Sequence, residues 1–314
     1  MPKARRVASL SIFYFLTVYL IFFLLKNSEL ARAEVLKGVR LCAKSVIPSL
    51  FPFMILCSVT LNSGLGEALG KLFGRPFSLL FGIPNDGSAV FILGCLFGFP
   101  LGTSNAAALY KKNLISKDDA ERLICFCSNT GPAFITGVAA PALGSMRTAW
   151  FIYISQILAA VIIGIFCRKQ NTIQTFQKEA GVSISPNLFI KAVTECVVPM
   201  LNICGFVTFF SCISCSVEAI LHRLNASPTV SLFAKGFLEI TNGFSAVGNF
   251  GQSIYTALLC AFFVGWSGLS VILQGCSIAK GFGLSCKRFV ISKLLQGCLT
   301  STFCLLFCKF FDIY

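Results

Sequence analysis

A carboxylate and an amide, Glu239 and Asn242, stand inside the otherwise apolar residues 233–244, flanked by Gly236 and Gly243. A charge at the centre of a bilayer costs about 3 kcal/mol, so such a residue normally faces a cavity or a partner. Glycines beside it favour a broken helix, which is how many transporters build a substrate site. The alternative is an ion pair between Glu239 and Lys235, one helical turn earlier, or a carboxylate at the level of the lipid headgroups.

A second polar group lies in residues 128–132, which read Ser-Asn-Thr-Gly-Pro. Gly131 and Pro132 interrupt a helix, so the backbone groups that they free, together with Asn129 and Thr130, can hydrogen-bond a polar solute. The alternative is a proline kink in which a neighbouring helix satisfies Asn129.

Residues 98–105 combine two glycines and a proline with Thr103, Ser104 and Asn105. They predict a re-entrant hairpin tip, or else a simple turn outside the membrane.

Gln274 either lines a site or makes a hydrogen bond between helices. The residues that we expect to bind a solute are Ser104, Asn105, Asn129, Thr130, Gly131, Glu239, Thr241, Asn242 and Gln274.

The composition indicates an all-α, polytopic membrane protein. Hydrophobic residues make up 56% of the 314 positions, 33 of them Phe, charged residues make up 12%, and the mean hydropathy is +0.81. We expect about eight or nine hydrophobic segments, beginning with a transmembrane helix over residues 7–25, and a multi-pass location in the cell membrane.

The composition also argues against several functions. The net charge of +14 comes from Lys and Arg scattered between apolar segments, which is typical of lipid headgroup contact rather than nucleic-acid binding. Most of the 16 cysteines lie in apolar runs, and the single His222 has no zinc-spaced partners. Motifs of phosphate-binding, metalloprotease or nucleophile-elbow type are absent from the sequence. We therefore expect no metal, no cofactor and no enzymatic activity.

The chain divides into two halves of similar order. We predict an N-terminal transmembrane segment over 1–34, a first repeat over 35–167, a polar linker over 168–186 and a second repeat over 187–314. In each half a proline-containing helix start is followed, after about 40 residues, by a glycine-rich broken segment. If each break is a re-entrant hairpin, each half crosses the membrane an odd number of times, so the two repeats are inverted.

Several motifs together resemble a known family. They are Pro48-Ser-Leu-Phe-Pro52, Gly98-Phe-Pro-Leu-Gly102, the Ser116–Arg122 segment leading into Cys127-Ser-Asn-Thr-Gly-Pro-Ala-Phe134, and Glu239-Ile-Thr-Asn-Gly243. From about residue 35 to 300 the chain is similar to YlbJ-type sporulation integral membrane proteins. That family carries the nucleoside-recognition or Gate module, shared with concentrative nucleoside transporters and bacterial ferrous-iron transporters. The resemblance implies a role in spore cortex formation.

Two functional hypotheses follow. The first is a transporter-like protein that binds a small polar, nucleoside-like solute between inverted repeats. The second is a non-transporting scaffold that binds partners in spore assembly. The partners expected are the lipid bilayer, a small polar solute and, for assembly, a second copy of the chain or other sporulation membrane proteins, without nucleic acid.

Overall fold

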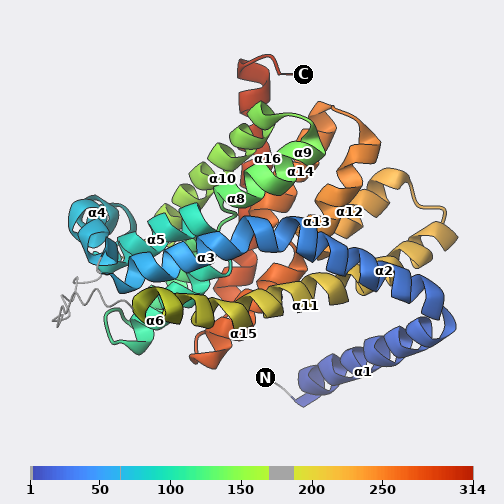
Figure 1. Ribbon diagram of the computed structural model, residues 1–314, viewed down its shortest axis with the longest axis horizontal. Helices are drawn as coiled ribbons and strands as arrows, with labels where there is room; N and C mark the ends of the chain where they lie inside the picture. The colour runs from blue at the N-terminus through green and yellow to red at the C-terminus, as the bar shows by residue number, and fades with distance from the viewer. Residues whose placement is uncertain (1–2, 64, 170–186, 314) are drawn as a thin grey trace.

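The computed structural model describes residues 3–63, 65–169 and 187–313, and every regular element in these ranges is helical (Figure 1). Six helical stretches there are long and apolar enough to cross a membrane, and a pair bent by 96°, Ala68–Phe81 with Asp86–Phe97, would make a seventh. The predicted all-α, multi-pass membrane class is confirmed. The predicted segments outnumber these spans because some are helices of only 11 or 12 residues, about 18 Å long against a hydrocarbon core of about 30 Å.

The first half begins with α1, which covers the predicted first transmembrane helix, and continues through α2, in which the predicted boundary at residue 34 falls. Its elements are α1 (Lys3–Lys26), α2 (Ser28–Leu41), the π-helical η1 (Cys42–Val46), α3 (Ile47–Asn62), α4 (Leu65–Phe81), α5 (Asp86–Phe97), α6 (Leu101–Lys111), α7 (Lys117–Cys127), α8 (Pro132–Phe134), the π-helical η2 (Ile135–Ala139), α9 (Ala140–Leu143) and α10 (Met146–Phe166). Most of the predicted linker lies outside the described residues.

The second half begins at the longest helix among the described residues. Its elements are α11 (Asn187–Arg223), α12 (Pro228–Leu238), α13 (Ile240–Val247), the 3-10 helix η3 (Gly248–Phe250), α14 (Ile254–Trp266), α15 (Leu269–Gly281) and α16 (Lys287–Phe310).

The two halves repeat one order of elements. A long helix is followed by a helical hairpin, directly after α11 in the second half and after α3 and the additional helix α4 in the first. A helix broken near its middle and then an unbroken helix (α10 or α16) come next in both halves. We call α5–α6 hairpin 1 and α12–α13 hairpin 2. Residues 128–131, between α7 and α8, are break 1, and Ser267–Gly268, between α14 and α15, are break 2. That the halves are related by an axis in the membrane plane stays a prediction.

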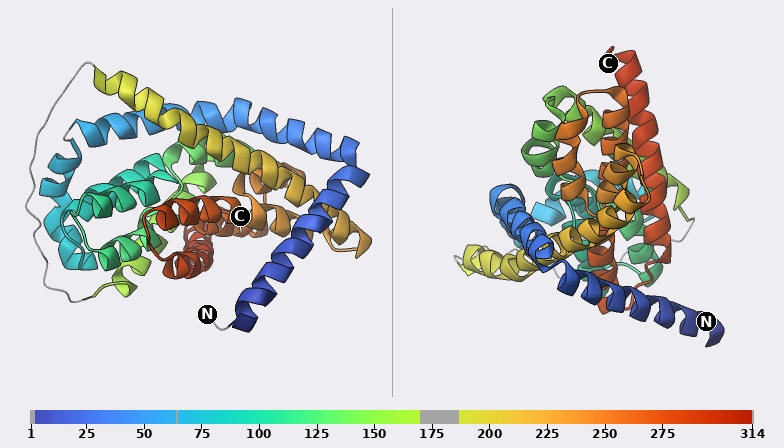
Figure 2. Two further views of the ribbon diagram at one scale, coloured as in Figure 1. Left: turned by 90° about the horizontal axis from the view of Figure 1, so that it is seen from below. Right: turned by 90° about the vertical axis from the view of Figure 1, so that its right-hand side faces the viewer.

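The long helices form a layer along one side of the molecule. Helix α11 packs against both α2 and α3. In Figure 2, left, α11 crosses the continuous stretch formed by α2, η1 and α3. We call α2–η1–α3 and α11 the long-helix pair. Behind it, α10, α14 and α16 pack together as a bundle (Figure 1). Buried Val46, Leu50, Met200, Ile203 and Val207 fill the contact within the pair.

Hairpin 1 turns at Gly98, Phe99 and Pro100, as its composition predicts. Gly98 has φ +83°, a conformation that favours glycine, and the Phe99–Pro100 peptide bond is cis. On the two legs, Gly94 and Gly102 both lie against the carbonyl oxygen of Cys127 at the end of α7. The absence of side chains at these two positions therefore allows hairpin 1 to pack directly on break 1.

Candidate functional site

The two hairpin tips and the two breaks are in contact at the centre of the fold. A Cβ placed on Gly131 of break 1 would lie 3.0 Å from the backbone nitrogen of Gly98 in hairpin 1. A Cβ on Gly268 of break 2 would lie 2.8 Å from the backbone nitrogen of Ile240 in hairpin 2. The hydroxyls of Thr130 and Ser267 both donate to the carbonyl of Val264, each at 3.4 Å, which joins the two breaks.

Break 1 holds its polar side chains in hydrogen bonds within the protein. Asn129 is fully buried; its Nδ2 donates to the carbonyl of Phe126 at 2.8 Å, and its Oδ1 accepts from Nε2 of Gln296 at 2.7 Å. Thr130 is fully buried as well. Asn129 and Thr130 therefore stabilise the broken backbone, and neither lines the two pockets described below.

Hairpin 2 turns at Glu239, whose backbone is extended (φ −149°, ψ 120°) between α12 and α13. Its Oε2 accepts from the backbone nitrogen of Asn242 at 2.6 Å, so the buried carboxylate caps α13, where the helix dipole favours negative charge. Thr241 lies beside this carboxylate. The amide of Asn242 bonds to Ser211 of α11, with its Nδ2 3.0 Å from the hydroxyl oxygen.

The alternative prediction for Glu239, an ion pair with Lys235, is wrong. Lys235 Nζ lies 2.8 Å from Glu218 Oε1 on α11, and it is this half-exposed carboxylate that pairs with the lysine. The extended backbone at Glu239 interrupts the helical spacing that would bring residues 235 and 239 onto one face.

We expect Glu239→Gln to leave stability unchanged, because the amide oxygen can still accept from Asn242. Glu239→Ala should lower the free energy of unfolding by about 1 to 2 kcal/mol, because the cap is lost. Thermal unfolding of the purified variants measures both. Lys235→Met is the control and should cost less than about 1 kcal/mol, because Glu218 is 48% exposed. A Lys235→Met loss as large as that of Glu239→Ala would contradict the capping role.

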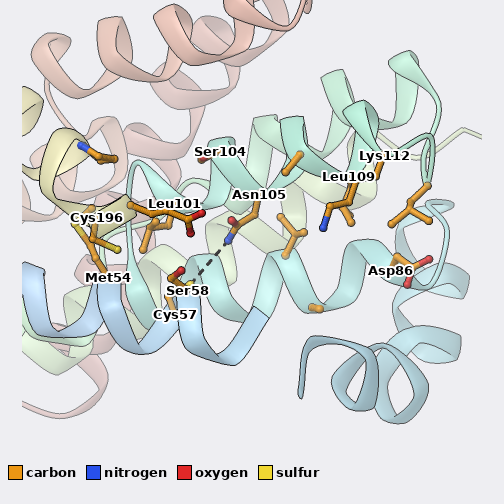
Figure 3. A pocket seen from close by; sticks show the side chains of 16 residues that line it. Met54, Cys57, Ser58, Asp86, Leu101, Ser104, Asn105, Leu109, Lys112 and Cys196 are labelled. Atoms are coloured by element: carbon orange, nitrogen blue, oxygen red, sulfur yellow. Dashed lines mark hydrogen bonds between the residues drawn. The ribbon is translucent and has the colours of Figure 1, made fainter. Parts of the chain in front are cut away.

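A pocket of about 320 Å³ with mixed polar and apolar walls lies between hairpin 1 and the long-helix pair, and we call it the hairpin-1 pocket (Figure 3). Ser104 and Asn105 of α6 line it, and Asn105 Nδ2 lies 3.9 Å from Sγ of Cys57 on α3. Its polar lining is completed by Ser58, Asp86, Lys112 and Glu195, and its other walls are Met54, Cys57, Ala89, Val90, Leu101, Ala108, Leu109, Leu114, Cys196 and Pro199. The pocket thus takes residues from both halves and offers amide, hydroxyl and charged groups.

A second pocket, of about 280 Å³, lies between hairpin 2 and the opposite part of the long-helix pair, and we call it the hairpin-2 pocket. Asn242 is the predicted site residue that lines it. The other lining residues are Glu34, Lys37, Ser214, Cys215, Glu218, Lys235, Ser245, Ala246 and Asn249. Each hairpin therefore presents a polar face to the same pair of helices.

Gln274 lies on α15 and is 5% exposed, and its Nε2 has no hydrogen-bond partner among the described residues. Thr103 and Ser270, on the facing helices α6 and α15, also have buried hydroxyls without a partner in the described part of the chain. Gly275 lies at this contact, because a Cβ there would be 3.6 Å from Oγ1 of Thr103, in ordinary van der Waals contact. The contact of α6 with α15 therefore contains polar atoms that the described residues leave without hydrogen bonds.

Two central residues were missed in the sequence analysis, Lys293 and Gln296 of α16. Both are buried, and both bond to break 1. A signal was present, because a lysine and a glutamine three residues apart in an apolar span share one helix face. Among the described residues, no group of three or more His, Cys, Asp or Glu side chains is placed to hold a metal ion.

The paired hairpins and broken helices place the chain in a known class of membrane-protein fold. The fold matches CNTnw, a concentrative nucleoside transporter, in an inward-facing substrate-bound state, with a TM-score of 0.60 at 13% identity over 98% of this chain and 87% of that one. A double variant of CNTnw in an outward-facing state matches with a TM-score of 0.54 at 11% identity, over 99% and 88%. The chain is thus a transporter-like, multi-pass membrane protein in its fold.

In sequence, the chain is similar to the sporulation integral membrane protein YlbJ of Bacillus subtilis (strain 168). The two are 26% identical over 98% of this chain and 84% of that protein. No family model matches. The resemblance to YlbJ-type sporulation proteins, inferred from the motifs, is confirmed by this match. These relatives are a sporulation membrane protein and a transporter.

Proposed function

We propose that this protein binds a small polar solute in the hairpin-1 pocket, between its two halves, and that this binding serves spore formation. The observation that carries the proposal is the pocket itself, in which polar side chains of hairpin 1 face the long-helix pair. Its volume of about 320 Å³ falls within the range of about 300 to 1,000 Å³ that is usual for small-molecule sites.

The lining favours a solute with several hydrogen-bonding groups. The amide of Asn105 can both donate and accept, the hydroxyls of Ser58 and Ser104 do the same, and Asp86 and Lys112 supply charges of opposite sign. Apolar walls from Met54 and Leu101 suit a flat ring. A nucleoside-like solute combines these properties.

The remaining predicted residues would act around this pocket. We propose that Asn242 contacts solute in the hairpin-2 pocket, at the other end of the pathway, and that Gln274 lines the route between them. Asn129, Thr130, Gly131, Glu239 and Thr241 would hold the breaks and tips in place. In transporters with inverted halves, substrate sites lie at the interface of the repeats and are formed by broken helices, which supports this arrangement.

The biological role that we propose is in assembly of the spore cortex. It is supported by the similarity to a sporulation integral membrane protein along nearly the whole chain. The alternative is a membrane scaffold without transport. One observation favours that alternative. Asn129 and Thr130, which we expected at a binding site, form hydrogen bonds with other residues of the protein.

The test is thermal unfolding of the purified protein with nucleosides and cell-wall precursors, compared with the Asn105→Leu variant. We expect a solute that raises the melting temperature of the wild type and binds Asn105→Leu about 5- to 150-fold more weakly, since losing a paired amide costs about 1 to 3 kcal/mol. Asn187→Leu, at the exposed start of α11 and outside both pockets, is the matched control. Equal stabilisation of wild type and Asn105→Leu would contradict binding in this pocket.

A further inference from the structure

Lys293 is a buried lysine in the second turn of α16 (Lys287–Phe310). Its side chain is 1% exposed, and its Nζ donates to the backbone carbonyl of Ser128 and to Oε1 of Gln296, each at 2.8 Å. Among the described residues, no carboxylate lies within ion-pair distance of this ammonium. The other ionisable groups beside it are the thiols of Cys95 and Cys127.

A buried ammonium normally needs a carboxylate, because its desolvation is costly. Here the partners are two neutral oxygens, and one of them is the carbonyl of Ser128, the C-cap residue directly after α7. The C-terminal end of a helix carries partial negative charge. In transporters with broken helices, such ends and unwound carbonyls coordinate a monovalent cation.

The surroundings hold the ammonium at one place. Gln296 accepts from Lys293 through Oε1 and donates through Nε2 to Asn129 at 2.7 Å and to the carbonyl of Gln156 at 3.4 Å. Break 1 is thereby bonded to α10 and α16 through a single amide. These hydrogen bonds hold the two oxygen atoms that accept from Lys293 in position without a bound metal ion.

We propose that Lys293 is a built-in cation that takes the place of a bound monovalent cation at break 1. The folded protein then needs no alkali cation at this position, and removal of the side chain turns the position into a cation site. The inference does not depend on solute binding, because it concerns the stability of the fold alone.

The experiment is thermal unfolding of wild type, Lys293→Ala and Lys293→Met in choline chloride, with NaCl or n-propylammonium chloride replacing it at equal ionic strength. The wild type should melt at one temperature in all three salts. Lys293→Ala should melt lower in choline chloride and recover at least half of the loss with Na⁺ or propylammonium. Lys293→Met, which fills the space without a charge, should melt lower and show no recovery.

Two results would overturn the proposal. One is a saturable rise in the melting temperature of the wild type with Na⁺, which would show that an ion site exists beside the lysine. The other is a Lys293→Ala protein that no cation restores, together with a Lys293→Met protein as stable as wild type. If Lys293→Ala can be purified only in the presence of Na⁺ or propylammonium, that requirement supports the proposal. If Lys293→Ala cannot be purified in any of the salts while Lys293→Met folds, the proposal is overturned.

Discussion

Replacing Gly102 with alanine is expected to prevent the protein from reaching its folded state. A Cβ at this position would overlap the carbonyl oxygen of Cys127 and come within 3.2 Å of Cα of Ser128. These are backbone atoms at the end of α7, so no side chain can turn aside to make room. Hairpin 1 would have to separate from break 1, at a cost above about 4 kcal/mol, which few single substitutions reach.

Gly205→Ala provides the matched control. Gly205 lies inside α11, and a Cβ there meets nothing within 4 Å. Because alanine is the better helix former by about 1 kcal/mol, this variant should be as stable as wild type or more so. Yield of monodisperse protein and its melting temperature measure both variants. A Gly102→Ala protein that purifies and melts like wild type would show that hairpin 1 does not pack on break 1 as described.

The second large effect is expected for Arg122→Met. Arg122 is 3% exposed, and its guanidinium donates to the carbonyls of Gly82 at 2.7 Å and Cys167 at 3.3 Å while pairing with Asp119. One side chain therefore joins the ends of α4 and α10 to the start of α7. Its removal leaves the buried carboxylate of Asp119 without its positive partner and takes a donor from two helix ends, so we expect a loss of about 3 to 5 kcal/mol.

Arg288→Met is the control for Arg122→Met, because Arg288 also binds an aspartate of the same helix start. Its Nη1 lies 2.9 Å from Asp118 Oδ1, but its side chain is 59% exposed, so its loss should cost at most about 1 kcal/mol. Equilibrium unfolding by denaturant in detergent measures the difference. Equal losses for the two variants would show that the buried network contributes no more than a surface ion pair.

Local signals in the sequence predict the places where the helices end. Gly98 and Pro100 turn hairpin 1, Gly131 ends break 1, and Glu239 stands at the turn of hairpin 2. Each depends on backbone conformations that glycine, proline or a capping carboxylate favours within a few residues. Such features can be read from a short stretch of chain.

The cavities and the buried network could not be predicted in the same way. Asn105 and Asn242 lie in different pockets because α11 crosses α2 and α3 between the hairpins, a contact between segments more than 120 residues apart. Lys293 reaches Ser128 across 165 residues. A single basic residue in an apolar span has the same local pattern whether it meets lipid headgroups or a broken helix.

The most direct test of the central claim is equilibrium dialysis of the purified protein against a small-molecule extract of sporulating Bacillus subtilis, with retained compounds identified by mass spectrometry. The wild type and the Asn187→Leu control should retain the same polar solute, and Asn105→Leu should lose it. Retention of that solute by Asn105→Leu, or a set of retained compounds identical for wild type and Asn105→Leu, would contradict a solute site in the hairpin-1 pocket.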